Sequence, residues 1–323
     1  MAADMLIRIG TRGSELALAQ TRQAAETLQA AHPGLECELH IIHTAGDRRT
    51  DIPLNEVNRA TGTADKGVFI AAIEDALAAG EIDCAVHSLK DMPGTLDPRF
   101  CLAAVLPREQ VEDVLVCRDD VDMDRLVVAT GSVRRARLVQ DVWPGSRTVP
   151  VRGNVATRLR KLAESAEATA TLLARAGLNR LGYTAPQMEL GGRTLSFRTL
   201  AVQDFPPALG QGAIALETRA ADPQTTALVA AVNHAPTSRC IRAERRFLDL
   251  LQADCSVPVA GYATEADGCM TLRVVYYPPH GPAVKLAHTG TAADSPEEVA
   301  AAVFTALQGG FSQSSCVPKG SSS

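Results

Sequence analysis

The sequence predicts an α/β protein, with two α/β domains followed by a smaller α+β domain. Short apolar strand patterns alternate with polar turns and helix patterns through most of the chain, as in α/β sheets. The chain has 323 residues, which is enough for two or three domains of roughly 100–200 residues each. From Asp222 onward the composition changes and two helix patterns precede a run of strand patterns, which indicates a separate α+β domain.

Composition and charge exclude several classes of protein. The hydrophobic content of 46% and charged content of 21% are typical of a soluble globular protein. A net charge of −5 argues against a nucleic-acid-binding surface, and an aromatic content of 4% argues against a stacking platform for single strands. No signal-peptide pattern and no run of about 18 apolar residues is present, so we expect a cytoplasmic protein without a membrane span. No apolar stripe predicts self-association, and we expect a monomer.

The first element predicted is a strand at Met5–Ile9, followed by a polar loop and a helix to about Ala30. Ser14 stands at the N-cap of this helix. A strand, a glycine-containing loop and a capped helix can bind an anion, because free backbone N–H groups point at the loop. Arg12 adds a bidentate donor for a carboxylate or phosphate.

A second strand is predicted at Glu36–Ile42, and a helix from Gly67 to about Ala79. The stretch between them, Ala45–Lys66, is polar and has few large apolar residues. A segment of this length without secondary structure is often a lid, and we interpret it as a mobile one.

The chain is organised around the next stretch, where a buried strand pattern ends abruptly at His87. Ligands of α/β sheets bind beyond the carboxyl ends of the strands, so Ser88, Lys90 and Asp91 lie where chemistry is expected. The alternative is a solvated turn that contains a purely structural Lys–Asp pair.

The second predicted domain also places charged residues where a strand ends and a helix begins. Arg134 and Arg135 follow a strand and a Gly-Ser turn at the start of a helix, and Arg152 and Arg158 flank the start of the next helix. Cations are disfavoured at helix N-termini by the helix dipole, so their presence there favours a nearby anion. Strands are predicted at 100–105, at the end of the first stretch of domain 1, and at 113–117, 126–130, 148–151 and 170–174 in the second domain.

The loop Pro206–Gly212 leads into a strand at 213–217 and indicates a return crossing between two domains. It lacks the G-x-G-x-x-G pattern of dinucleotide-binding proteins. We expect residues 1–106 and 204–221 to form domain 1, 107–203 domain 2 and 222–308 domain 3, with a disordered tail at 309–323. The elements of domain 3 are predicted at 225–233, 238–251, 259–262, 271–276, 284–288 and 296–307.

Eight cysteines are present, without C-x-x-C or zinc-ligand spacing, so we expect neither a disulfide framework nor a metal site. Cys255 differs from the others because it lies in a loop before Val-Pro, which makes it a candidate for covalent chemistry. The neighbouring Asp254 would raise rather than lower the pKa of the Cys255 thiol. An attachment site therefore fits better than a fast nucleophile.

Seven motifs, in this order, resemble the porphobilinogen deaminase family over nearly the whole chain. They are Thr11–Ser14, His87–Pro93, Gly131–Arg135, Arg152–Arg158, Ala176–Gly182, Leu209–Ala213 and Asp254–Pro258. The resemblance implies two domains like those of the type II periplasmic binding proteins, with the active site in the cleft between them. It also implies a dipyrromethane cofactor, made from the enzyme's own substrate and attached covalently through Cys255.

The activity implied by the resemblance is that of a transferase in tetrapyrrole and heme biosynthesis. Four porphobilinogen molecules are joined head to tail with loss of ammonia, and hydrolysis releases the linear tetrapyrrole hydroxymethylbilane. Asp91, Lys90 and Arg12 are expected to be catalytic, with Asp91 facing the pyrrole N–H groups and stabilising developing positive charge. The residues expected at the cofactor are Cys255, Asp91, Lys90, Ser88, Thr130, Ser132, Arg134, Arg135 and Lys66. Those expected at substrate carboxylates are Arg12, Ser14, Arg152, Arg158 and Gln211, the arginines binding bidentately.

The chain departs from the family pattern at two places. Ala253-Asp254 stands where the family usually has Gly-Gly, and the lid at 55–65 is longer and lacks one lysine. A non-catalytic binding protein for a small anion would also explain a cleft with arginines, but it would not need Cys255. A dehydrogenase or aminotransferase is a further alternative; no dinucleotide motif favours the former, and only Lys90 could form a Schiff base in the latter.

Overall fold

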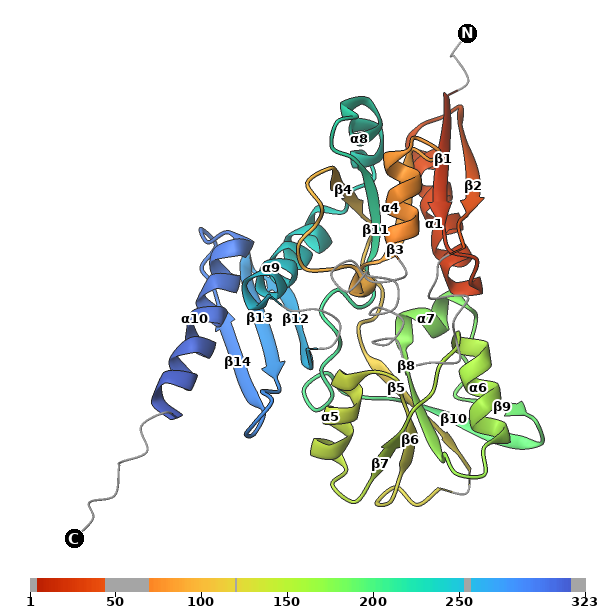
Figure 1. The fold of residues 1–323 in the computed structure, drawn as a ribbon, viewed down its shortest axis with the longest axis vertical. Helices are drawn as coiled ribbons and strands as arrows, with labels where there is room; N and C mark the ends of the chain where they lie inside the picture. Colours follow the sequence, from red (N-terminus) through yellow and green to blue (C-terminus); the bar gives the residue numbers. More distant parts are fainter. Residues whose placement is uncertain (1–4, 44–69, 120, 253–256, 315–323) are drawn as a thin grey trace.

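The computed structural model describes residues 5–43, 70–119, 121–252 and 257–314, and these form three units, each built on one sheet (Figure 1). The predicted fold class is confirmed: two α/β units are followed by a smaller α+β unit. None of the helices in the described ranges is long and apolar enough to cross a membrane.

The first unit has a five-stranded sheet in the order β2-β1-β3-β11-β4. Strand β1 pairs in parallel with β2 and β3, whereas β11 returns from later in the chain and pairs antiparallel with β3 and β4. Its core contains Ile9, Leu28, Val86 and Leu216. The elements are β1 (Met5–Thr11), α1 (Glu15–Ala31), β2 (Leu35–Ile41), α4 (Ala71–Ala78), β3 (Cys84–Ser88), β4 (Phe100–Val105) and β11 (Ile214–Arg219).

The second unit has a six-stranded sheet in the order β7-β6-β8-β5-β10-β9. Alternate residues of the central strand β5 enter two different cores, so both faces of this sheet are buried. The strands β9 and β10, which we did not predict, form a hairpin at the edge around Gly191-Gly192. The elements are β5 (Asp113–Arg118), β6 (Val127–Ala129), α5 (Val133–Val142), β7 (Arg147–Val149), α6 (Val155–Glu164), β8 (Ala170–Ala174), α7 (Arg175–Arg180), β9 (Gln187–Leu190) and β10 (Arg193–Thr199).

The third unit is an antiparallel sheet, β12-β13-β14, with α9 and α10 packed on one face (Figure 1). The other face places Ala260 and Tyr277 against Phe205 and the core beside α5, and Tyr277 Oη donates to Asp141 Oδ2 over 2.8 Å. The elements are α9 (Ala235–Leu251), β12 (Val259–Ala266), β13 (Cys269–Tyr276), β14 (Val284–Thr289) and α10 (Pro296–Ser314).

Two boundaries differ from those predicted. Helix α8 (Pro223–Ala230) was assigned to the third domain, but Val229 and Val232 pack in the core of the first unit, so the third unit begins after them. Helix α10 continues to Ser314 rather than ending at Leu307, and residues 309–314 of the expected disordered tail are helical. Ala306 and Gln308 favour helix, but Gly309 and Gly310 do not, so helix propensity does not predict this extension.

Two crossings, residues 106–112 and 200–213, connect the first unit to the second. Gly212 has a φ of +88°, and a Cβ there would lie 2.4 Å from the carbonyl oxygen of Glu109 in the other crossing. Gly210 has a φ of +79°, and a Cβ there would lie 3.1 Å from the backbone nitrogen of Lys90. Only glycine lets the two crossings pack against each other and against the turn after β3.

Candidate active site

The centre of the site is the turn that follows β3, η1 (Leu89–Asp91), a single 3-10 turn. Leu89 and Met92 are buried and anchor it to the first unit, while Lys90 and Asp91 are only partly buried. Ser88 Oγ donates to Gln20 Oε1 of α1 over 2.8 Å. The buried strand therefore ends in a fixed turn that presents an ammonium and a carboxylate, as the sequence predicts.

Lys90 lies against the second unit. Its Nζ donates to Gln211 Oε1 over 3.4 Å. Burial lowers the pKa of Lys90 to about 8, and the positive charge of Arg135 contributes, while Asp91 and Asp113 act in the opposite direction. The ammonium is therefore the main form at neutral pH, but it can lose its proton within about one pH unit.

The wall opposite η1 is the start of α5, where Ser132 is the N-cap and accepts a hydrogen bond from Arg135 N over 3.4 Å. Thr130 Oγ1 accepts from Ser132 N over 3.1 Å and fixes the loop before the helix. Both hydroxyls keep a proton that they can donate to a bound anion.

Arg134 and Arg135 are buried and share one carboxylate, that of Asp113. Arg134 Nη2 lies 2.8 Å from Asp113 Oδ2, and Arg135 Nη2 lies 2.7 Å from Asp113 Oδ1. Burial alone would raise the pKa of Asp113, but the two guanidinium groups hold it well below its usual range. One carboxylate between two arginines leaves an excess of positive charge.

Two more arginines flank the start of α6, whose N-cap is Asn154: Arg152 lies in the loop before it and Arg158 in its first turns. Arg158 Nε donates to Gly153 O over 2.8 Å. Burial lowers the pKa of Arg158 to about 10; Arg135 and Arg152 lower it as well, while Asp91 raises it. The charge of Asp91 thus acts both on Lys90 of the first unit and on Arg158 of the second.

Arg12 and Ser14 lie at the same edge of the first sheet. Gly10 of β1 is in register with Ala85 of β3, so the loop after β1 and the turn after β3 leave the sheet side by side. Ser14 Oγ caps α1 by accepting from Ala17 N over 3.3 Å. Arg12 is partly buried in that loop.

Gln211 is fully buried, and both ends of its amide are bonded within the protein. Its Nε2 donates to Val111 O over 2.7 Å and to Asp113 Oδ1 over 2.9 Å, and its Oε1 accepts from Lys90. The structure therefore places Gln211 between the crossings and beneath Lys90. Cys255, Lys66 and Asp254 lie outside the described residues.

Three residues of this region were missed in the sequence. Asp113 was counted only as the start of a strand, yet an acidic residue that opens an apolar strand is a recognisable signal of a buried ion pair. Gln20 and Arg180 line a cavity of about 30 Å³ together with Ser88 and Lys90. Arg180 Nη2 donates to Gly212 O over 2.8 Å, and burial lowers the pKa of Arg180.

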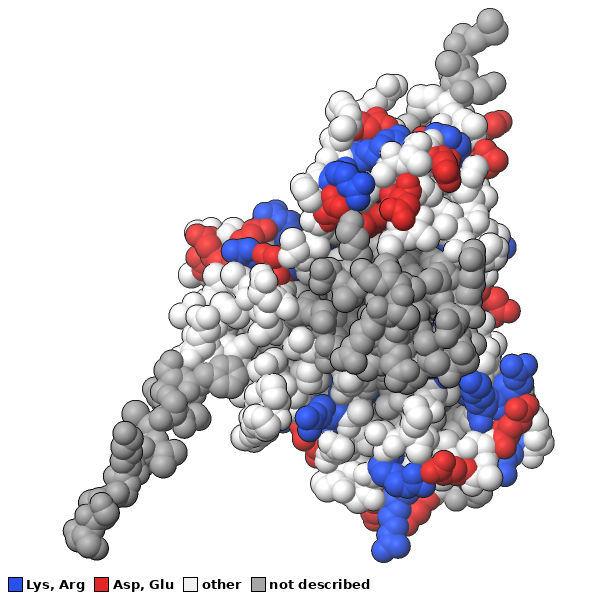
Figure 2. Space-filling model, in the orientation of Figure 1, with Lys and Arg blue, Asp and Glu red and all other residues white. Residues whose placement is uncertain are grey.

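Charge elsewhere is arranged differently. On the face drawn in Figure 2, acidic and basic side chains are interspersed over the first and second units.

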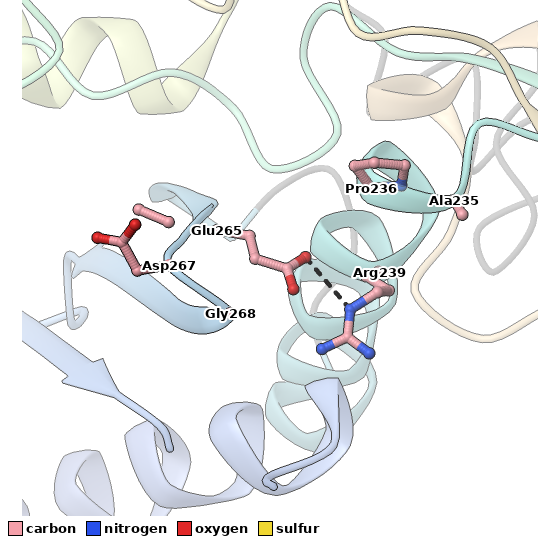
Figure 3. A pocket seen from close by; sticks show the side chains of 7 residues that line it. Ala235, Pro236, Arg239, Glu265, Asp267 and Gly268 are labelled. Carbon is pink, nitrogen blue, oxygen red and sulfur yellow. Dashed lines mark hydrogen bonds and ion pairs between the residues drawn. The ribbon is translucent and has the colours of Figure 1, made fainter. Parts of the chain in front are cut away.

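A more open cavity of about 390 Å³ lies on the third unit, between the start of α9 and the β12–β13 turn (Figure 3). There Arg239 Nε pairs with Glu265 Oε2 over 3.2 Å, and none of the predicted site residues lines it.

Two family models match most of the chain. Residues 7–227 match the family model described as "Porphobilinogen deaminase, dipyromethane cofactor binding domain", and residues 238–308 match "Porphobilinogen deaminase, C-terminal domain". Porphobilinogen deaminase of Shouchella clausii is 39% identical over 310 residues, which cover 94% of this chain and 95% of the relative. That of Syntrophobacter fumaroxidans is 40% identical over 273 residues, which cover 83% of each chain.

Among solved structures, an arginine-specific periplasmic binding protein of Salmonella typhimurium covers 71% of this chain and 91% of its own, with 12% identity and a TM-score of 0.40. The two family models together match parts of all three units. The chain therefore belongs to the porphobilinogen deaminase family.

Proposed function

We propose that the protein joins four porphobilinogen molecules head to tail, releases ammonia at each addition and frees linear hydroxymethylbilane by hydrolysis. One observation carries the proposal: the charges of Asp91 and Arg135 both act on Lys90 of the first unit and on Arg158 of the second. Such a site suits a substrate that bears carboxylates and develops positive charge during the reaction.

The described residues fit a dipyrromethane cofactor by their chemistry. Its acetate and propionate groups are anions, and the buried arginine pair with a single carboxylate offers unbalanced positive charge. Its pyrrole N–H groups are donors and match the Asp91 carboxylate. When bound, the cofactor would supply the primer to which substrate units are added. Cys255 is proposed to hold it, in the connection between α9 and β12.

The chain's own residues have separable tasks in this proposal. Arg12, Arg152 and Arg158 bind substrate carboxylates, since a guanidinium forms two parallel hydrogen bonds with a carboxylate. Asp91 stabilises the positive charge that develops as ammonia leaves. Lys90 is protonated at neutral pH, and its pKa of about 8 suits it to exchange a proton during turnover.

The remaining contacts hold the reacting groups in place. Ser88, Thr130, Ser132 and Lys66 are proposed to contact the cofactor, and Ser14 a substrate carboxylate. Gln211, which is already bonded to Lys90, would act on the substrate through that lysine. That the protein works as a monomer stays a prediction. A cytoplasmic location stays a prediction.

The test is turnover with porphobilinogen, measured by two products at once. Ammonia and, after oxidation, uroporphyrin absorbance should both increase, with about four molecules of ammonia for each tetrapyrrole, as the reaction requires. Binding of porphobilinogen without ammonia release would contradict the proposal and favour a non-catalytic binding protein. An absorbance spectrum typical of pyridoxal phosphate would favour an aminotransferase instead.

A further inference from the structure

The buried carboxylate of Asp113 accepts more hydrogen bonds than a single ion pair would provide. Asp113 is the first residue of β5, where the first crossing enters the second unit, and it is completely buried. Its Oδ1 accepts from Arg135 Nη2 and Gln211 Nε2, and its Oδ2 accepts from Arg134 Nη2 at 2.8 Å and Arg135 Nε at 3.3 Å. A single side chain therefore connects α5 with both crossings.

Each arginine has a second anchor that fixes the plane of its guanidinium group. Arg134 Nη1 donates to Pro206 O over 2.7 Å, in the second crossing. Arg135 Nη1 donates to Leu172 O over 2.8 Å, in β8. With Asp113 on one edge and a backbone carbonyl on another, neither guanidinium can turn freely, so the edges left for an anion keep a defined direction.

Gln211 extends this network to the turn after β3. Its Nε2 is bonded to Asp113 and its Oε1 to Lys90, so an unbroken series of hydrogen bonds runs from Arg135 through Asp113 and Gln211 to Lys90. Arg135 and Lys90 belong to different units, and both are cations of the site. Their relative position therefore depends on groups that touch neither substrate nor cofactor.

We propose that Asp113 is a positioning residue. It orients Arg134 and Arg135 towards carboxylates in the cleft, and through Gln211 it fixes the position of Lys90 relative to these two arginines. This inference rests on the proposed function. A purely structural ion pair would need one arginine and no link to Lys90, whereas Asp113 takes two arginines and the glutamine that reaches the lysine.

The test compares Asp113→Asn with a matched control, Glu244→Gln. Glu244 of α9 is also completely buried, and it pairs with Arg108 of the first crossing at 2.5 Å. For Asp113→Asn we expect the KM for porphobilinogen to rise by about tenfold or more, the usual effect of losing a charge-assisted hydrogen bond. Glu244→Gln should lower the melting temperature and leave the KM unchanged.

A second readout is independent of turnover. The protein has five lysines, so reductive methylation with carbon-13 should give few NMR signals, and Lys90 can be titrated directly. Asp91 and Asp113 raise the pKa of Lys90, while Arg134 and Arg135 lower it, so Asp113→Asn should move its titration to lower pH. Lys161, whose Nζ donates to Arg152 O on the surface of α6, provides the reference signal and should not move.

Gln211→Met keeps the size of the side chain and removes its hydrogen bonds. This second variant keeps the inference testable if Asp113→Asn does not fold. It should raise the KM, and it should also cost some stability because Val111 O, Asp113 and Lys90 lose a buried partner. A variant of either residue that changes only the melting temperature, with the wild-type KM and Lys90 titration, would overturn the inference. A wild-type protein that makes no product would instead contradict the proposed function, while the lysine titration would still decide the link to Asp113.

Discussion

Asp113 and Glu244 are two completely buried carboxylates near the crossings, and they are bonded very differently. Glu244 faces one guanidinium, that of Arg108, and fills its remaining capacity with the backbone N–H groups of Gly210 at 2.6 Å and Ala263 at 2.7 Å. Its charge is balanced. Asp113 faces two guanidiniums and an amide, and cations outnumber anions around it.

The difference distinguishes a buried ion pair that only connects segments from a charged cluster that can also bind a ligand. A balanced buried pair connects three segments, the first crossing, the second crossing and the third unit, and leaves nothing for a ligand. An unbalanced cluster is costly to bury unless an anion completes it, because buried charges need partners. The excess of positive charge around Asp113 is therefore a reason to propose that a carboxylate ligand binds near Arg134 and Arg135.

The largest effect is expected for Asp91→Asn, which removes the carboxylate from the cationic site while keeping its shape. Loss of a preorganised electrostatic group of this kind lowers kcat on the order of 100- to 1000-fold. Steady-state kinetics should show this fall with little change in the melting temperature. Asp91→Glu is the matched control, and recovery of part of the rate would tie the effect to the charge.

Replacing one arginine in each cluster by methionine tests the comparison directly. Arg108→Met leaves Glu244 buried without its partner, so urea unfolding should show a loss of about 3–5 kcal/mol. Arg135→Met leaves Arg134 on Asp113 and should cost less stability, but it should raise the KM for porphobilinogen. Equal effects of the two variants on both stability and KM would remove the distinction.

The pH dependence of turnover should follow Lys90. Its pKa is lowered to about 8, so the ammonium is present below that pH and is lost as the pH rises through it. If the protonated form is required, kcat should fall on the basic side with a midpoint near pH 8. In Lys90→Arg, whose guanidinium stays charged, this limb should disappear. An unchanged limb in the variant would assign the titration to another group.

The smallest effect compares two helix caps. Ser132 caps α5 in the site, whereas Ser295 caps α10 in the third unit by accepting from Glu298 N over 3.3 Å. Substitution of either serine by alanine should lower the free energy of unfolding by about 1 kcal/mol. Only Ser132→Ala should also raise the KM, and a rise in both variants would mean that capping, not ligand contact, is responsible.

Local sequence patterns were sufficient for most of the fold. The apolar run that ends at His87, the cap at Ser14, the Gly-Ser turn before α5 and the return loop before β11 all predicted their elements close to the observed bounds. The hairpin β9–β10 was missed although Gly191-Gly192 is a turn signal and both strands alternate apolar and polar residues, with Leu195 and Phe197 buried in β10. The unit to which α8 belongs depends on which sheet Val229 packs against. A local sequence pattern does not carry this information.

The site was predictable as a set of charges but not as a network. The sequence places arginines at two helix starts and Lys90-Asp91 after a strand. It does not reveal that Arg134 and Arg135 share Asp113, which lies 21 and 22 positions away. Nor does it show that Gln211 joins Asp113 to Lys90, because that link needs both crossings to meet.

The central claim is that this cationic cleft serves a covalently attached dipyrromethane. The most direct measurement is the intact mass of the denatured protein, before and after incubation with porphobilinogen, for the wild type and for Cys255→Ala. We expect the wild type to exceed its sequence mass by two linked pyrrole units and the variant to show no excess. A wild-type mass that stays unmodified after incubation, or an excess that persists in Cys255→Ala, would contradict the account.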